Sequence, residues 1–285
     1  MTRQIILHIG SPKCGSTYLQ RILLQNAPTL RDRGIHYPHD GGPHPGNAAG
    51  LEQIDAAGLA ALFPGNTHTT VLSHEDLYAL PRRGKPLASL AREAGITVQP
   101  VVFIRPFSEF IFGDYSQFMK QHFETFLAKR APYDGRSFQE FALRRIETLK
   151  PAGFLSGWNK LFPDAPLILE GHRRIRPVIE QLLGADSIPN WELHEQHTNP
   201  SLRMEDCDRI AAAMRNPDCS KAEIRAMFRD AFHTAGQPDR GRTLEHITWL
   251  EAAFEPQNAA LLRIFGYDNR RPPADILQAT RKING

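Results

Sequence analysis

The sequence predicts an α/β protein with a central parallel sheet between two layers of helices, helical insertions and a helical C-terminal region. Short apolar runs typical of buried strands alternate with segments in which apolar residues recur every three or four positions, as on one face of a helix. Strands and helices that alternate in this way form parallel sheets, because each connection crosses back over the sheet. We therefore expect a three-layer α/β/α arrangement.

Four strands are expected, over residues 4–10, 69–75, 98–105 and 166–170. The expected helices cover residues 16–25, 48–63, 87–94, a long amphipathic segment from 107 to 126, and residues 138–162. Beyond these the chain is expected to be mostly helical, with an irregular stretch over residues 185–203. Residues 34–50 contain five Gly, three Pro and three His, a composition typical of a long irregular loop.

Composition and length limit the possible classes of protein. With 285 residues and 41% apolar content, the chain is expected to form one domain over residues 1–285. Its 34 Lys and Arg nearly balance its 31 Asp and Glu, which excludes a global field for nucleic acid or a membrane surface and leaves only local anion sites. Cys14, Cys207 and Cys219 have the spacing of neither a disulfide framework nor a metal site. Because Met1 leads directly into a strand, without a leader or a long apolar run, a cytoplasmic chain with no stable membrane anchor is expected.

The segment GSPKCGST at residues 10–17 lies between an expected strand and an expected helix. Backbone N–H groups and the helix dipole converge at such a junction and attract an anion. Gly15 allows close backbone approach, the hydroxyls of Ser16 and Thr17 can donate to phosphate or sulfate oxygens, and Lys13 adds a charge. The segment indicates a fold of the P-loop-containing nucleotide-binding type.

The position of Lys13 is the most informative feature of this loop. An ATP-binding loop, G-x-x-x-x-G-K-[ST], has its Lys directly after the second Gly, but here Ser16 holds that position and the Lys stands three residues earlier. A Lys at the apex of the loop lies near the bridging oxygen of a bound phosphosulfate, where negative charge grows as the S–O bond breaks. It can therefore stabilise the leaving group.

A second cation, Arg105, ends the expected strand at residues 98–105. Ligands of open α/β sheets bind at the carboxyl ends of the strands, so Arg105 is expected to face the same crevice as Lys13. A guanidinium can hold a second phosphate bidentately.

With both segments considered, the chain resembles the sulfotransferases that use 3′-phosphoadenosine 5′-phosphosulfate (PAPS), and bacterial members in particular. The resemblance rests on LHIGSPKCGSTYLQ at residues 7–20 and FIRPFSEFIFGDYSQ at residues 103–117, with weaker likeness at residues 198–202 and 254–262. It implies that PAPS is the donor and that Arg105 binds its 3′-phosphate. It also implies that the 5′-phosphosulfate is bound by Ser11, Pro12, Lys13, Cys14, Gly15, Ser16, Thr17 and Tyr18.

The chain departs from the family at one position of the second motif. The family has a Ser eight residues after the Arg, but that position is Gly113 here, so Ser116 or a backbone N–H is expected to supply the missing phosphate contact.

Sulfonate transfer also needs a base to take the proton of the acceptor, and residues 71–75 bring two candidates to a strand end, His74 and Glu75. Resemblance to bacterial members favours Glu75, whereas the cytosolic enzymes use a His from a comparable strand. A structural alternative is that His74 is buried against the sheet and Glu75 or Asp76 caps the helix beginning near Leu77.

Three further histidines, His36, His39 and His44, share the loop at residues 34–50. No cysteine or carboxylate completes a metal-binding spacing with them, so contact with a substrate is the preferred interpretation and no metal is expected.

The sequence therefore predicts in-line transfer of a sulfonate from PAPS to a hydroxyl or amine of a small-molecule, lipid or saccharide acceptor, without nucleic acid; the oligomeric state stays open. One alternative is a P-loop kinase that uses ATP and Mg²⁺, with residues 70–76 as the strand that ends in the metal-binding acid. The absence of Lys at position 16 speaks against it. A second alternative, suggested by Gly113, is a non-catalytic nucleotide-binding protein.

Overall fold

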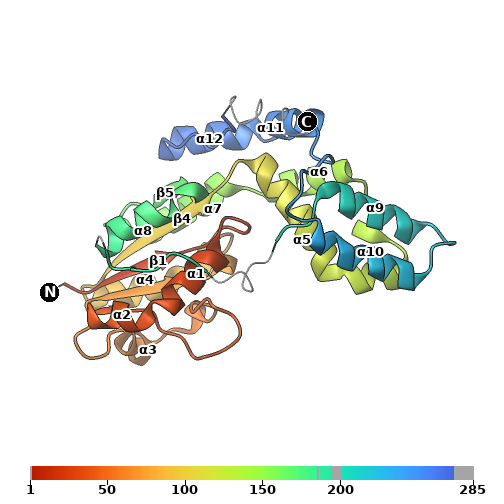
Figure 1. Ribbon diagram of the computed structural model, residues 1–285. Coiled ribbons are helices and arrows are strands. Elements are labelled where there is room, and N and C mark those ends of the chain that lie inside the picture. Colours follow the sequence, from red (N-terminus) through yellow and green to blue (C-terminus); the bar gives the residue numbers. More distant parts are fainter. Residues whose placement is uncertain (1, 185, 194–199, 273–285) are drawn as a thin grey trace. The chain divides into compact units, whose positions relative to one another are not determined.

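The computed structural model describes residues 2–184, 186–193 and 200–272, and Figure 1 shows the chain as a ribbon. The chain divides into two compact units, and the segments that form one unit alternate along the sequence with those that form the other. Among the described residues, the first unit comprises 2–105, 151–193 and 260–267, and the second comprises 106–150, 200–259 and 268–272. The expectation of a single domain stays a prediction.

All the strands belong to the first unit. Its elements are β1 (Gln4–His8), α1 (Ser16–Gln25), α2 (Ala27–Asp32), β2 (Ile35–His36), α3 (Ala56–Ala61), β3 (Thr69–Ser73), α4 (Lys85–Glu93), β4 (Thr97–Ile104), α7 (Pro151–Leu161), β5 (Ile168–Gly171) and α8 (Ile175–Leu183). The second unit contains α5 (Phe107–Lys129), α6 (Phe138–Thr148), α9 (Met204–Arg215), α10 (Lys221–His233) and α11 (Leu244–Ala253), and α12 (Glu255–Phe265) has residues in both units.

The five strands form one parallel sheet in the order β2-β3-β1-β4-β5, so the predicted α/β class with a parallel sheet is confirmed. The central strand β1 pairs with β3 on one side and β4 on the other, with His8 level with Ser73 and Val101. After β1 the chain runs toward β2 at one edge, and after β4 it runs toward β5 at the other edge. The connections thus diverge beside the carboxyl end of β1, which is where open α/β sheets bind ligands.

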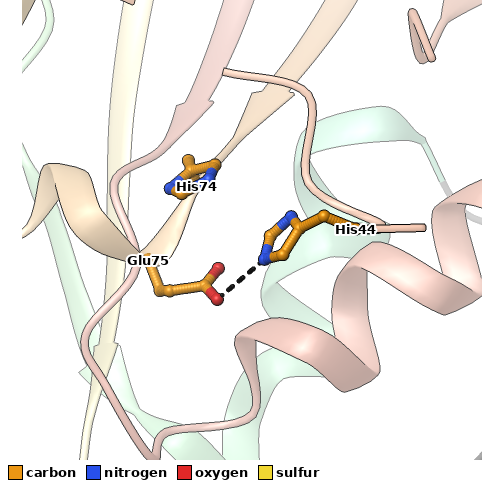
Figure 2. A group of neighbouring side chains, drawn as sticks. All are labelled: His44, His74 and Glu75. Atoms are coloured by element: carbon orange, nitrogen blue, oxygen red, sulfur yellow. Dashed lines mark hydrogen bonds and ion pairs between the residues drawn. The ribbon is translucent and has the colours of Figure 1, made fainter. Parts of the chain in front are cut away.

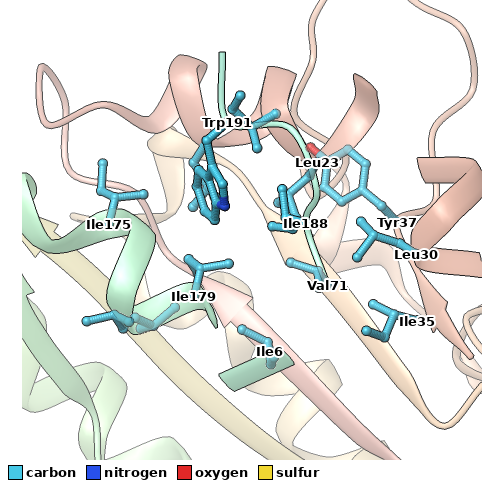
Figure 3. Packing of buried hydrophobic residues seen from close by; sticks show 14 of the residues in the cluster. Ile6, Leu23, Leu30, Ile35, Tyr37, Val71, Ile175, Ile179, Ile188 and Trp191 are labelled. Atoms are coloured by element: carbon cyan, nitrogen blue, oxygen red, sulfur yellow. The ribbon is translucent and has the colours of Figure 1, made fainter. Parts of the chain in front are cut away.

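One face of the sheet carries a core that includes residues from α1, α2 and α8 (Figure 3). Ile6 and Val71 reach this core from β1 and β3, and α8 adds Ile175 and Ile179. The neighbours of Ile6 in sequence, Ile5 and Leu7, point to the opposite face and are also fully buried. Both faces are therefore covered, which is compatible with three layers.

The predicted strands are confirmed with small shifts of their ends, and the helix at residues 16–25 is confirmed with the same bounds. The structure adds β2, a two-residue strand inside the predicted loop, which pairs with Thr69 and Thr70. So short a strand has no periodicity to reveal it.

Two predicted helices were wrong in extent. Residues 48–63 form a 3₁₀ turn (Leu51–Gln53) followed by α3, which begins where Asp55 accepts a hydrogen bond from the Gly58 N–H. Residues 138–162 form two helices, α6 and α7, because Pro151 disfavours helical backbone in the residue before it. The irregular stretch predicted at residues 185–203 lies partly outside the described residues.

The long amphipathic helix predicted from residue 107 is confirmed as α5, and its aromatic stripe is buried, as shown by Phe110, Tyr115 and Phe126. Among the described residues, no helix combines the length and the apolar character needed to cross a bilayer.

Candidate active site

The loop between β1 and α1 has three residues in the left-handed region of backbone space. Their φ angles are 73° at Gly10, 62° at Lys13 and 89° at Gly15. A non-glycine residue in this region costs about 1–2 kcal/mol, so the Lys13 backbone is strained. Changes of hand along a loop turn successive N–H groups into one concave surface that suits an anion.

The helix that follows this loop, α1, has an uncapped N-terminus. Gly15 is the N-cap of α1, and among the described residues no side chain caps the helix and no acidic residue lies in its first turn. The N–H groups of the first turn and the positive end of the helix dipole are thus left for a ligand.

Inside the loop, the side chains of Ser11, Cys14 and Ser16 are buried. The Cys14 N–H and the Ser16 hydroxyl both donate to the Ser11 carbonyl, over 3.3 Å and 3.4 Å. These bonds hold the loop in shape. Pro12 is half-buried and Thr17 is exposed.

Arg105 follows the last residue of β4 and lies beside Cys14. Burial raises the pKa of the Cys14 thiol, and the positive charge of Arg105 opposes that shift. Among the described residues, the buried Nε of Arg105 has no hydrogen-bond acceptor, although the Arg105 side chain also forms a hydrogen bond with the Cys14 thiol. Buried polar groups almost always have partners, so an unpaired guanidinium nitrogen beside the loop fits an anion that binds there.

Glu75 is the second residue after β3 and is packed against the loop from the other side. A Cβ placed on Gly10 would lie 2.3 Å from the Cα of Glu75, so only glycine fits at this point. The loop at residues 10–15 therefore lies between the groups that follow β3 and β4.

Both oxygens of the Glu75 carboxylate accept hydrogen bonds. His44 Nε2 lies 3.0 Å from Oε1, and the Gln20 amide donates to Oε2 over 3.1 Å. Figure 2 shows His44, His74 and Glu75 together, with the imidazole of His44 directed at the carboxylate. Burial raises the pKa of Glu75, but the hydrogen bonds from Gln20, from its own backbone and from His44 outweigh burial, so the pKa lies below its usual value. The carboxylate is therefore ionised at neutral pH.

Behind Glu75, hydrogen bonds lead to the buried side chain of His8. The Gln20 amide also donates to the Ser73 hydroxyl over 3.1 Å, and that hydroxyl lies 2.7 Å from His8 Nδ1. Burial lowers the pKa of His8 to about 4, only partly offset by the charge of Glu75. His8 is thus neutral at neutral pH, and its hydrogen bond orients the Ser73 hydroxyl.

His74 is buried, and it caps the turn after β3 itself. The Asp76 N–H donates to His74 Nδ1 over 3.2 Å. The structural alternative was therefore right about the burial of His74 but wrong about the cap, which neither Glu75 nor Asp76 provides. His44 has the same arrangement, because the Gly46 N–H donates to its Nδ1 over 3.0 Å. A backbone N–H can only donate, so each neutral ring carries its proton on Nε2.

Two predicted donor-binding residues have other contacts. The Tyr18 hydroxyl donates to the Trp191 carbonyl over 2.8 Å, which joins α1 to the segment after α8. Ser116 belongs to the second unit, where its buried hydroxyl accepts from the Leu202 N–H over 2.7 Å. The role of both residues in binding PAPS stays a prediction.

Sequence reasoning did not select Gln20, and it assigned His44 to substrate contact and not to a bond with Glu75. Gln20 carried a signal, since it lies between Leu19 and Ile22 on the buried face of α1, where an amide needs polar partners. His44 carried none beyond its place in a loop with two other histidines. Comparison of the chain with family models, curated proteins and solved structures gave no match.

Proposed function

We propose that this chain is a sulfotransferase with a P-loop-containing nucleotide-binding fold, which transfers a sulfonate from PAPS to a hydroxyl or amine. The observation that carries the proposal is the lysine at the apex of the loop after the central strand, held in a strained left-handed conformation next to an uncapped helix. Strain of this kind persists where surrounding structure or function requires it.

The two phosphate groups of PAPS have separate partners in this proposal. The N–H groups of residues 15–18 and the Thr17 hydroxyl bind the 5′-phosphosulfate, and the Ser16 hydroxyl turns from the Ser11 carbonyl to join them. Arg105, whose buried Nε lacks an acceptor, binds the 3′-phosphate that distinguishes PAPS from ATP.

Of the two candidates for the base, the hydrogen bonds favour Glu75. The only lone pair of neutral His74 is taken by the Asp76 N–H, so its ring cannot accept a proton without losing that bond. The Glu75 carboxylate has about four lone-pair sites and accepts three hydrogen bonds, from Gln20, His44 and its own backbone, so one site remains for the proton. A lowered pKa makes Glu75 a weaker base, but it keeps the carboxylate ionised and therefore able to accept a proton.

The transfer step moves one proton to Glu75 and one sulfonate group to the acceptor. Glu75 takes the proton of the acceptor O–H or N–H while the acceptor atom attacks sulfur. The bond between sulfur and the bridging oxygen breaks, and that oxygen stays on adenosine 3′,5′-bisphosphate, where Lys13 stabilises its charge.

A metal centre at His44, His74 and Glu75 was a further possibility, since one ligand atom from each lies within 4.8 Å of the others. Metal-bound histidines usually donate their second ring N–H to an acceptor. Here both Nδ1 atoms accept from backbone N–H groups, so the Nε2 atoms are donors and not ligands. This arrangement supports a hydrogen-bonded carboxylate.

The cysteines Cys14, Cys207 and Cys219 are free thiols, which fits a reducing compartment such as the cytoplasm.

Calorimetry with adenosine 3′,5′-bisphosphate and with ATP plus Mg²⁺ tests which nucleotide the chain binds. The Arg105→Lys variant tests whether Arg105 binds the 3′-phosphate. We expect the bisphosphate to bind and the variant to lose affinity for it, but not for adenosine 5′-phosphate. Transfer from ³⁵S-labelled PAPS to a phenol, a saccharide and a lipid alcohol then tests the reaction. Mg²⁺-dependent ATP turnover with none from PAPS would establish the kinase instead, and binding without transfer to any acceptor would favour the non-catalytic alternative.

A further inference from the structure

The loop that carries His44 is attached to the sheet at a defined point. Asn47 forms three hydrogen bonds with β3: its amide donates to the Val71 carbonyl over 2.9 Å, its side-chain oxygen accepts from the Ser73 N–H over 2.7 Å, and its own N–H donates to the Ser73 carbonyl over 3.0 Å. The Asn47 contacts thus extend the edge of β3 beyond its pairing with β2. They place His44, three residues earlier, beside the carboxyl end of the strand.

Two contacts determine the orientation of the His44 ring. The Gly46 N–H donates to Nδ1, which leaves the ring proton on Nε2, 3.0 Å from Glu75 Oε1. The ring also stacks on His74, with centroids 4.8 Å apart and planes inclined by 23°. The side chain of His44 remains about half exposed (48%), so its orientation comes from these contacts and not from burial.

Gln20 completes the arrangement from the opposite side. Its amide donates to Oε2 of Glu75 and to the Ser73 hydroxyl, so it is itself oriented by the sheet. A carboxylate that accepts one bond on each oxygen from two oriented donors cannot rotate freely.

We propose that His44 is a positioning residue, whose Nε2–H holds the Glu75 carboxylate in one orientation for proton abstraction. This inference rests on the proposed role of Glu75 as the base. His44 does not accept the proton itself, because its lone pair is used by Gly46.

Several titratable groups surround Glu75 and could influence its protonation. They are His8 on β1, Tyr37 and His44 from the segment after α2, and His74 and Asp76, its neighbours in sequence. Of these, His44 makes the direct hydrogen bond to the carboxylate. A test must therefore separate loss of that bond from a general loosening of the loop.

The test uses three variants of His44 and one control in the full-length chain. His44→Leu removes the donor at similar volume, His44→Asn keeps a polar group on a shorter side chain, and His44→Gln keeps an N–H at nearly the reach of Nε2. His39→Leu is the control, because within the described part of the chain His39 forms its hydrogen bonds inside the same loop, with the His44 carbonyl and the Gly41 N–H, and none with Glu75.

The first measurement is the titration of the Glu75 carboxyl carbon by ¹³C NMR, which needs no substrate. Loss of a donor to the carboxylate raises its pKa, so we expect the Leu and Asn variants to titrate at higher pH than the parent chain, and the Gln and His39→Leu variants to titrate close to it. The Asn variant keeps the comparison valid if the Leu variant does not fold. An unchanged titration in both variants overturns the inference.

The second measurement is the pH dependence of kcat/KM for sulfonate transfer. We expect its acid limb to move to higher pH in His44→Leu, with kcat lower by roughly 10- to 100-fold and recovery in His44→Gln. If the parent chain transfers no sulfonate but the NMR titrations shift as expected, the proposed function fails while the positioning of Glu75 by His44 stands.

Discussion

Gly10 and Glu75 approach each other so closely that a single methyl group cannot fit between them. The Cβ that an alanine would add at Gly10 lies 2.3 Å from the Glu75 Cα and 3.0 Å from its carbonyl carbon and oxygen. Contacts with backbone cannot be relieved by a change of rotamer. Glu75, two residues after β3, and Gly10, two residues after β1, therefore form one rigid junction between the proposed base and the proposed anion site.

Gly10→Ala tests this junction, and Gly41→Ala is its matched control. Both glycines have a positive φ, 73° and 82°, but a Cβ at Gly41 meets nothing within 4 Å. We expect Gly41→Ala to lower the free energy of unfolding by about 1 kcal/mol, from the backbone conformation alone. Gly10→Ala should cost about 1–3 kcal/mol more because of the overlap, and it should also reduce turnover. Urea unfolding of both variants measures the difference, and equal losses would contradict the close contact.

Lys13→Gly separates the charge of Lys13 from its backbone strain. Glycine adopts a φ of 62° without a steric cost, so we expect the free energy of unfolding to stay the same or rise slightly. Sulfonate transfer should fall by about 100-fold or more, because one charge contact to the leaving oxygen is lost. Lys160→Ala, at an exposed position of α7, is the control and should transfer at the normal rate. Normal turnover in Lys13→Gly excludes the assigned role.

Glu75→Gln and His74→Asn distinguish the two candidate bases. The asparagine oxygen can replace Nδ1 as the acceptor of the Asp76 N–H, so His74→Asn keeps the cap and loses only the imidazole. We expect Glu75→Gln to lower kcat by roughly 10²- to 10⁴-fold, and His74→Asn to change it little. The reverse pattern in steady-state assays would assign the base to His74.

Titration of His8 makes the stability of the fold depend on pH. Burial lowers the pKa of His8 from 6.5 to about 4, so between these values the unfolded chain binds a proton that the folded chain does not. The free energy of unfolding is therefore unaffected by His8 above pH 6.5, and it falls as the pH drops from 6.5 toward 4, by on the order of 3 kcal/mol. His8→Asn keeps an acceptor for Ser73 without titrating. Its free energy of unfolding should therefore fall less steeply over this range, whereas slopes equal to those of the parent chain would show that His8 is not the cause.

Local patterns in the sequence were sufficient for most of the scaffold. The apolar run of β1 and the helical spacing of α1 predicted the strand, the loop and the helix around the proposed anion site, because hydrophobic periodicity and turn residues are properties of neighbouring positions. The parallel arrangement also predicted that Lys13 and Arg105 follow neighbouring strands. The break at Pro151 was equally local, and the prediction failed there because the helical spacing on both sides was given more weight than the proline.

The surroundings of the carboxylate depended on the path of the chain through space. Glu75 meets Gln20 and His44 across 55 and 31 residues of sequence. Gln20 reaches it because α1 follows β1, which pairs with β3, and His44 reaches it because the loop containing Asn47 attaches to β3. Short-range periodicity contains no information about which distant loop reaches a strand end or which ring nitrogen keeps its proton. The residue types and the loop proposed to attract an anion can thus be predicted from the sequence alone. Family resemblance already favoured Glu75 over His74 as the base, but the physical reason proposed for that preference lies in the fold, because it depends on lone pairs that backbone N–H groups occupy in three dimensions.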